Sequence, residues 1–111
     1  MRTDESAVAR LLGALGLCAK ARKLITGTAL ICEALRNERT RPCLVLAASD
    51  NSENTAKRLA DRCAYYGVRL TVLQVNGDTL SSALGKSGRV AAVALTDPNL
   101  CRLVENTLKS I

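Results

Sequence analysis

The sequence contains no histidine, phenylalanine or tryptophan, and its only aromatic residues are Tyr65 and Tyr66. The hydrophobic core therefore has to be built from aliphatic side chains. The scarcity of aromatics argues against nucleic-acid binders of the RRM and OB-fold types, because these stack bases on aromatic side chains. Without histidine, a zinc site and the commonest general base of enzymes are both disfavoured.

Segments that would direct the chain to a membrane are also lacking. Residues 1–5 are polar and contain no apolar stretch typical of a secretory signal. No apolar run approaches the roughly 18 residues of a membrane-spanning helix. We therefore expect a protein with no membrane partner.

The cysteines are few, widely spaced and without a CxxC pair. They are Cys18, Cys32, Cys43, Cys63 and Cys101. An odd number at wide spacing, without a secretory signal, predicts reduced and mostly buried thiols in a cytoplasmic protein. Because no two cysteines have the spacing of zinc ligands, we expect no metal and no cofactor.

Aliphatic residues and positive charge are what the sequence does contain. Hydrophobic residues make up 48% of the 111 positions, which is enough for the core of a single domain spanning 1–111. Sixteen Lys and Arg oppose ten Asp and Glu, and the net charge of +6 favours polyanionic partners such as RNA. Segment 20–41 alone carries six cations and two acids. The cations are Lys20, Arg22, Lys23, Arg36, Arg39 and Arg41.

Apolar periodicity predicts helices that alternate with short strands. The predicted helices lie around residues 8–15, 28–37, 54–66, 80–84 and 98–108. The predicted strands are 24–26, 43–48, 70–75 and 90–95. Two of these strands, 43–48 and 90–95, are continuously apolar, as strands buried on both faces are. The pattern predicts an α/β fold, a three-layer α/β/α sandwich with a four-stranded mixed sheet.

The helix 54–66 and its neighbours carry finer predictions. We expect the face with Ala56, Leu59, Ala60 and Cys63 to be buried, and Lys57, Arg58 and Arg62 to form a solvated face. Asp50, paired with Glu53, is predicted to cap this helix. Asp78 and Asp97 are also interpreted as helix caps, and Gly67 as a left-handed stop.

Short motifs that could indicate catalysis are better explained structurally. Gly85-Lys86-Ser87 lacks the upstream glycine of a phosphate-binding loop and precedes a strand instead of opening a helix. Gly13-Ala14-Leu15-Gly16 lies inside a predicted helix, where close helix packing explains it. Cys18 has cations nearby that could lower its pKa, but a buried, inert thiol is the better reading. We therefore expect no enzyme.

Four stretches together resemble a known family. They are Leu15–Gly27, Ala48–Thr55, Cys63–Val68 and Arg89–Asp97. As a set they resemble the L-seven-Ae/L-thirty-e family of ribosomal proteins, in particular its bacterial YlxQ-like branch. The resemblance covers about residues 10 to 109. It implies an α/β/α sandwich and binding to kink-turn RNA, a sharply bent RNA helix with tandem sheared G·A pairs.

The resemblance also implies where RNA binds. In the family, the loop before the second helix and the first turn of that helix enter the RNA groove, and the loop before the last strand packs on flipped-out bases. Together with the clustered cations, this predicts an RNA-binding set of Lys20, Arg22, Lys23, Gly27, Thr28, Ala29, Leu30, Asn51, Thr55, Gly85, Lys86, Gly88, Arg89 and Val90.

Roles can be assigned within this set. Lys20, Arg22, Lys23 and Arg89 are expected to neutralise phosphates. Gly27 and Thr28 are expected to present backbone amides at the start of a helix.

The chain departs from the family at three positions of the second helix. Strong kink-turn binders have Asn, Glu and Lys where this sequence has Ala29, Leu30 and Glu33, and Glu33 repels phosphate. One reading is a monomeric ribonucleoprotein component that binds structured RNA, such as ribosomal or kink-turn RNA, and associates with the ribosome. The alternative is a protein-interaction module that has lost kink-turn binding, with Ala29 and Leu30 as an apolar docking patch. A small enzyme using Asp50 or Asp97 is a third reading.

Overall fold

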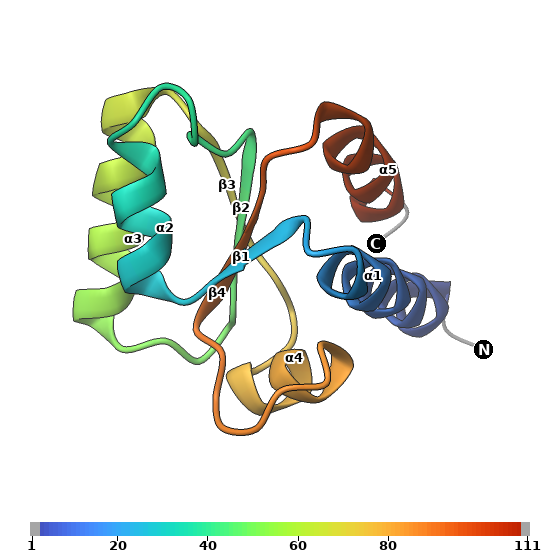
Figure 1. The fold of residues 1–111 in the computed structure, drawn as a ribbon. Coiled ribbons are helices and arrows are strands. Elements are labelled where there is room, and N and C mark those ends of the chain that lie inside the picture. Colours follow the sequence, from blue (N-terminus) through green and yellow to red (C-terminus); the bar gives the residue numbers. More distant parts are fainter. Residues whose placement is uncertain (1–2, 110–111) are drawn as a thin grey trace.

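The computed structural model describes residues 3–109 of the chain, and the side chains of residues 6–109. The helices are α1 (Thr3–Lys20), α2 (Thr28–Leu35), α3 (Glu53–Tyr66), α4 (Gly77–Ala83) and α5 (Pro98–Leu108). The strands are β1 (Leu24–Thr26), β2 (Leu44–Ala47), β3 (Arg69–Val72) and β4 (Ala92–Leu95). Helices α2 and α3 cover one face of the sheet, and α1, α4 and α5 lie on the other (Figure 1). The predicted α/β/α sandwich is confirmed.

The sheet is mixed, with the strand order β1-β4-β2-β3. Strand β4 runs antiparallel to both β1 and β2, whereas β2 and β3 are parallel. The two central strands, β2 and β4, come from the two continuously apolar runs of the sequence, and every residue in them is buried. Helices on both faces explain why these strands show no polar alternation.

Alternate side chains of the central strands enter two different cores. In β2, Leu44 and Leu46 pack with residues of α1, α4 and α5, whereas Val45 and Ala47 pack with residues of α2 and α3. The period of two follows from the pleat of the strand. Strand β4 divides in the same way, with Val93 and Leu95 on the first side and Ala92 and Ala94 on the second.

The strand register defines two ends of the sheet. The start of β2, the end of β4 and the start of β1 lie side by side, because Leu44 and Leu24 both pair with Leu95. We call this the Asp97 end, after the residue that follows β4. The opposite end holds the end of β2 and the start of β4, which pair through Ala47 and Ala92. We call it the Asn51 end, and the chain passes from one end to the other through β1, over about 10 Å.

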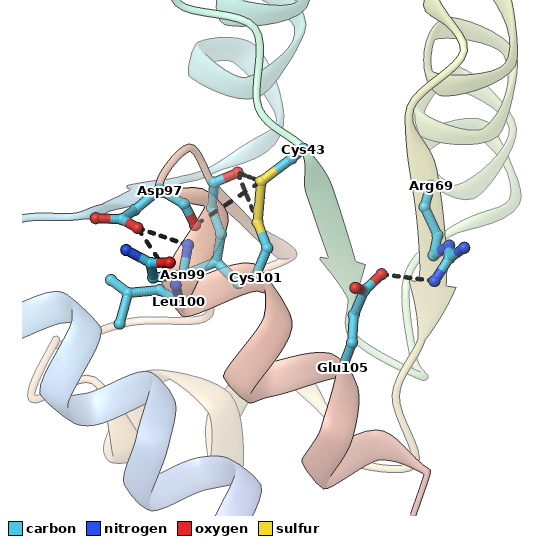
Figure 2. The surroundings of a disulfide bond; sticks show 8 residues. Cys43, Arg69, Asp97, Asn99, Leu100, Cys101 and Glu105 are labelled. Carbon is cyan, nitrogen blue, oxygen red and sulfur yellow. Dashed lines mark hydrogen bonds and ion pairs between the residues drawn. A yellow bond between two sulfur atoms is a disulfide. The ribbon is translucent and has the colours of Figure 1, made fainter.

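Several helix boundaries have the predicted chemistry. Gly67 ends α3 in the left-handed conformation with φ 69°. Asp97 caps α5 by accepting hydrogen bonds from the backbone N–H groups of Asn99 and Leu100 (Figure 2). Gly16 lies where α1 approaches α4 so closely that a Cβ would be 2.8 Å from the carbonyl oxygen of Ala83. Close packing is therefore the role of Gly16.

Other local predictions are wrong. Ser52, and not Asp50, caps α3 by accepting from the N–H of Thr55, and Asp50 turns toward α4 instead. Asn76 caps α4, so Asp78 is a first-turn residue. Ala56 and Ala60 are exposed, because only Leu59 and Cys63 of α3 reach the core. Strands β3 and β4 are also shorter than the predicted 70–75 and 90–95.

The prediction that all cysteines are reduced thiols is wrong for one pair. Cys43 and Cys101 form a disulfide that joins the residue before β2 to the first half of α5 at the Asp97 end (Figure 2). The two residues are 58 positions apart, so spacing along the chain gave no sign of the pair. Cys18, Cys32 and Cys63 are free and buried, as predicted. Near the disulfide, Arg69 on β3 forms a 2.6 Å ion pair with Glu105 on α5.

Candidate nucleic-acid interface

The start of α2 lies at the Asn51 end of the sheet. Gly27 precedes the helix with φ 100° and ψ 144°, a backbone conformation that favours glycine. Its N–H donates to the carbonyl of Ala92 on β4 at 3.0 Å, so it does not present a free amide as predicted. Gly27 has no side chain to cap the first turn, whereas α3, α4 and α5 each have a side-chain cap. The first-turn amides that begin at Thr28 therefore open toward the Asn51 end.

Asn51 ties the turn before α3 to the start of β4. Its Nδ2 donates to the carbonyl of Ala91 at 2.9 Å, and its Oδ1 accepts from the Arg89 guanidinium at 2.8 Å. Both functions of the amide are thus used within the protein. Thr55 lies one turn into α3, half-buried, with its hydroxyl 3.1 Å from Ser52 Oγ.

Arg89 is held in an ion pair across 39 residues of sequence. Its Nη2 donates to Asp50 Oδ1 at 2.7 Å, and the same oxygen accepts from the N–H of Gly77 at 2.9 Å. The Arg89 side chain lies on Gly77, where a Cβ would clash with it. The Arg89 hydrogen bond, followed by that from Gly77, holds the pKa of Asp50 below its ordinary value of 3.8. The Asp50 carboxylate therefore stays ionised at neutral pH. Its ion pair with Arg89 weakens only when the pH falls below the ordinary pKa of 3.8.

The hydrogen bonds to Asp50 and Asn51 orient Arg89 without using all of its N–H donors. A guanidinium has five N–H donors, and the two hydrogen bonds described here both use Nη2. The side chain is 39% exposed. Arg89 is thus partly neutralised but pre-positioned at the Asn51 end.

The loop before β4 is fixed on α4. Gly85 and Gly88 both have positive φ, at 71° and 80°. The buried Ser81 donates through its hydroxyl to the carbonyl of Lys86, and its own carbonyl accepts from the Lys86 N–H. Val90 is buried in the core, so its side chain is not available to pack on a base. The loop surface consists of residues 85–89.

The three cations Lys20, Arg22 and Lys23 lie away from this loop. Lys20 is the last residue of α1, and Arg22 and Lys23 lie between α1 and β1. All three therefore lie at the Asp97 end, where Lys23 Nζ is 4.0 Å from Asp97 Oδ2. Arg22 has a positive φ of 59°, which turns the chain from α1 into β1. The predicted RNA-binding set is therefore split into two groups separated by the length of β1.

An open groove of about 1100 Å³ follows α2 between these two groups. Its lining includes Ala29 and Leu30, and Leu30 is 59% exposed. Lys86 reaches it from the loop before β4, and Arg58 and Arg62 reach it from α3. Sequence reasoning placed these two arginines on an ordinary solvated face, because the proximity of α3 to α2 is not visible in the sequence.

The buried thiols of Cys18 and Cys63 both have raised pKa values, which disfavours the reactive thiolate form. Burial, and secondarily the charge of Asp97, raises the pKa of Cys18, which supports an inert thiol and not one activated by nearby lysines. Burial, followed by Cys32, raises the pKa of Cys63 to about 11. Within the described residues there is no group of three metal-ligating side chains.

Membrane insertion has no helical candidate in the described part of the chain. None of the helices between residues 3 and 109 combines the length and the apolar character needed to cross a bilayer.

Sequence comparisons match the chain to one family and two curated relatives. The model of the "Ribosomal protein L7Ae/L30e/S12e/Gadd45 family" matches residues 9–104. The RNA-binding protein YlxQ of Bacillus subtilis (strain 168) is 41% identical over 83 residues, which cover 75% of this chain and 79% of that protein. The RNA-binding protein YlxQ of Enterococcus faecium is 33% identical over 84 residues, covering 76% and 79%.

Solved structures show the same architecture. A Bacillus halodurans protein of unknown function superposes with a TM-score of 0.80 at 29% identity, covering 91% of this chain and 98% of that one. The Giardia lamblia 15.5kD RNA binding protein superposes with a TM-score of 0.76 at 17% identity, covering 96% and 88%. The second likeness concerns the fold alone.

Proposed function

Because this chain belongs to the ribosomal protein L7Ae/L30e/S12e/Gadd45 family, we propose that it is an RNA-binding protein whose target is a structured, kink-turn-like RNA. The observation that carries the proposal is the arrangement at the Asn51 end. There the uncapped start of α2 lies at the same end of the sheet as the loop 85–89. Asp50, which precedes α3, holds Arg89 of that loop in place. Membership of the family also agrees with the prediction that the chain is not an enzyme.

The chemistry of a bent RNA suits this end of the molecule. At a sharp bend the phosphates crowd together, and a helix N-terminus stabilises negative charge through its dipole and its unpaired N–H groups. The amides from Thr28 onward supply these groups. The remaining donors of Arg89, together with Lys86, add positive charge at the same end of the sheet. The backbone carries much of this recognition, so it does not require the Asn and Lys that Ala29 and Glu33 replace.

The cations at the Asp97 end extend the proposal. Lys20 and Arg22 are exposed and are separated from the start of α2 by β1, a strand about 10 Å long. A stem leaving the bend along β1 would bring its phosphates to them. A cytoplasmic, monomeric protein that acts on ribosomal RNA or at the ribosome is consistent with this scheme.

A gel shift with kink-turn RNA tests the proposal, with an unbent duplex of the same length as the control. We expect tighter binding to the kink-turn at every salt concentration, with affinity falling as salt rises. The Thr28→Pro variant is a structural probe, because proline at the first helical position removes one N–H while it preserves the helix. It should weaken kink-turn binding more than duplex binding. Equal affinity of the wild type for both RNAs would refute kink-turn recognition.

The exposure of Leu30 favours a second candidate function, a protein-interaction module on the same fold. Ala29 and Leu30 present an apolar patch at the start of α2, where strong kink-turn binders carry polar residues. A partner protein docked there should remain bound after nuclease treatment and should be lost in the Leu30→Glu variant. Loss of all partners on nuclease treatment would leave RNA as the sole ligand.

A further inference from the structure

One face of α3 continues from the proposed interface toward the Asp97 end. Thr55, Arg58, Arg62 and Tyr65 follow one another at spacings of three, four and three residues, which places them on a single helical face. This face runs for about 15 Å along the helix. Its first member, Thr55, belongs to the predicted RNA-binding set. We call these four residues the α3 stripe.

The neighbouring wall of the groove comes from α2. Cys32 of α2 lines the same groove as Arg58 and Arg62 of α3. Arg36 follows Cys32 by one turn, lines the same groove as Arg58 and Arg62, and is exposed. Glu33 is the one acidic residue in the lining. Three arginines therefore oppose one carboxylate along this flank.

Ion pairs within the described part of the protein do not account for Arg36, Arg58 and Arg62. Among the side chains of residues 6–109, the ion pairs include none with Arg36, Arg58 or Arg62. The acidic residue nearest the stripe in sequence, Asp61, is paired with Lys57 at 3.0 Å. Within residues 6–109, Glu33 is therefore the one acidic side chain in the groove lining, and it forms no ion pair with these arginines.

The stripe ends in an exposed aromatic ring. Tyr65 is 82% exposed and packs edge-on against Tyr66, with ring centroids 4.8 Å apart. The Arg41 guanidinium lies over the Tyr66 ring, 4.7 Å from its centroid. Because Arg41 also donates to the carbonyl of Leu35 at 2.7 Å, the aromatic pair is anchored to the end of α2. The Tyr65 ring is therefore exposed, and Tyr66 and Arg41 support it.

We propose that the α3 stripe and Arg36 bind a single-stranded extension of the RNA that is held at the Asn51 end. Arg58, Arg62 and Arg36 contact successive phosphates, and Tyr65 stacks on a base. Proteins that bind single-stranded nucleic acid commonly combine cations along a groove with aromatic rings that stack on bases. A duplex would satisfy the arginines but leave Tyr65 without a role. This inference rests on the proposed function, since it needs an RNA anchored beside Thr55.

The test uses four kink-turn RNAs and an unbent duplex, measured by fluorescence anisotropy. The first is a blunt-ended kink-turn, and the second and third are the same kink-turn with a single-stranded tail of about ten nucleotides at its 5′ or its 3′ end. The fourth is the blunt kink-turn with its stem lengthened by the same number of base pairs. An unbent duplex with and without the tails completes the set.

We expect one of the tails to strengthen binding about tenfold over the blunt kink-turn, and the lengthened stem to add less. R58Q/R62Q should abolish the gain from the tail and lower the salt slope by about 1.4, at about 0.7 for each phosphate contact to a single strand. Y65A should reduce the gain at least about fivefold without changing the slope. None of these variants should affect the blunt kink-turn. R10Q/R102Q removes the same charge from α1 and α5, on the other face of the sheet, and should leave the gain intact.

The outcomes separate this inference from the proposed function. If neither tail strengthens binding, or if R58Q/R62Q and R10Q/R102Q behave alike, the stripe is not a binding surface. If the lengthened stem gives the same gain as the tail and Y65A has no effect, the single-stranded assignment is wrong. If kink-turn and unbent duplex bind equally while a tail still strengthens both, the kink-turn proposal fails and the stripe stands.

Discussion

Two carboxylates lie beside the proposed interface, and they differ in whether a cation holds them. Asp50 accepts from both Arg89 and the Gly77 amide. Glu33 has no ionic partner among the described side chains and lies in the groove along α2. A bound phosphate meets repulsion from either charge. Only Asp50 also has a positive effect, because it holds Arg89 in place.

The substitutions D50N and E33Q should therefore change RNA affinity in opposite directions. We expect E33Q to strengthen kink-turn binding about two- to fivefold at low salt, since it removes about 1 kcal/mol of repulsion or less. D50N should weaken binding about three- to tenfold despite also removing a negative charge, because it releases Arg89. Titrations by anisotropy at two salt concentrations measure both effects. If D50N strengthens binding as E33Q does, Asp50 does not position Arg89.

The packing of α1 on α4 depends on one of the two glycines in α1. A Cβ on Gly16 would be 2.8 Å from the Ala83 carbonyl oxygen, whereas a Cβ on Gly13 would meet nothing within 4 Å. Because α4 supports the loop 85–89, this contact bears on the interface as well as on stability.

Replacing each glycine with alanine should give stability changes of opposite sign. G16A should lower the free energy of unfolding by about 1 to 3 kcal/mol, since backbone has to move. G13A should raise it by up to about 1 kcal/mol, because alanine is the better helix former at an exposed position. Urea denaturation followed by circular dichroism measures both. A destabilised G13A, or a G16A as stable as wild type, would contradict the described contact.

The disulfide joins the residue before β2 to α5, at the opposite end of the sheet from the start of α2. Closing a loop of 58 residues restricts the unfolded chain and is worth about 4 kcal/mol in the chain-entropy model. Dithiothreitol should therefore lower the denaturation midpoint of the wild type and leave that of C43S/C101S unchanged. Both forms should bind a kink-turn with trimmed stems equally wherever they are folded, because the start of α2 and the loop 85–89 lie at the opposite end of the sheet from the disulfide. A wild-type midpoint that is insensitive to the reductant would show that the two cysteines do not pair in solution.

The cations of the predicted RNA-binding set are divided between the two ends of the sheet. Lys86 and Arg89 lie at the Asn51 end, and Lys20, Arg22 and Lys23 lie at the Asp97 end. Lys23 is close to Asp97, which leaves Lys20 and Arg22 as the stronger candidates for phosphate contacts there. An RNA that uses both groups has to follow the flank of the sheet along β1.

The length of the RNA should decide whether the distant cations contribute. With a long-stemmed kink-turn, K20Q/R22Q should lower the salt slope by about 1.8, at about 0.9 for each duplex phosphate contact. With stems trimmed close to the bend, the same variant should bind like wild type. Competition titrations between about 50 and 200 mM salt measure the slopes. An unchanged slope with the long stem would remove Lys20 and Arg22 from the binding surface.

Much of the architecture could be predicted from local pattern. The apolar runs at 43–48 and 90–95 identify strands covered on both faces, and the alternating helices then require a sandwich. Gly67 and Asp97 end and begin helices as their chemistry predicts. The run Leu15–Gly27, with its companion stretches, identifies the family. Each of these features depends on residues close together in the chain, so the sequence by itself determined them.

Contacts between distant segments were decided only by the tertiary structure. Arg89 meets Asp50 across 39 residues, and Cys43 meets Cys101 across 58. The sequence alone predicts Arg58 and Arg62 as solvated charges, whereas in the structure they line the groove along α2. Sequence proximity grouped Lys20 with Thr28, yet β1 carries them to opposite ends of the sheet. Charge and chemistry are written residue by residue, but which groups share a surface depends on strand order and register, and these are set by packing of the whole chain.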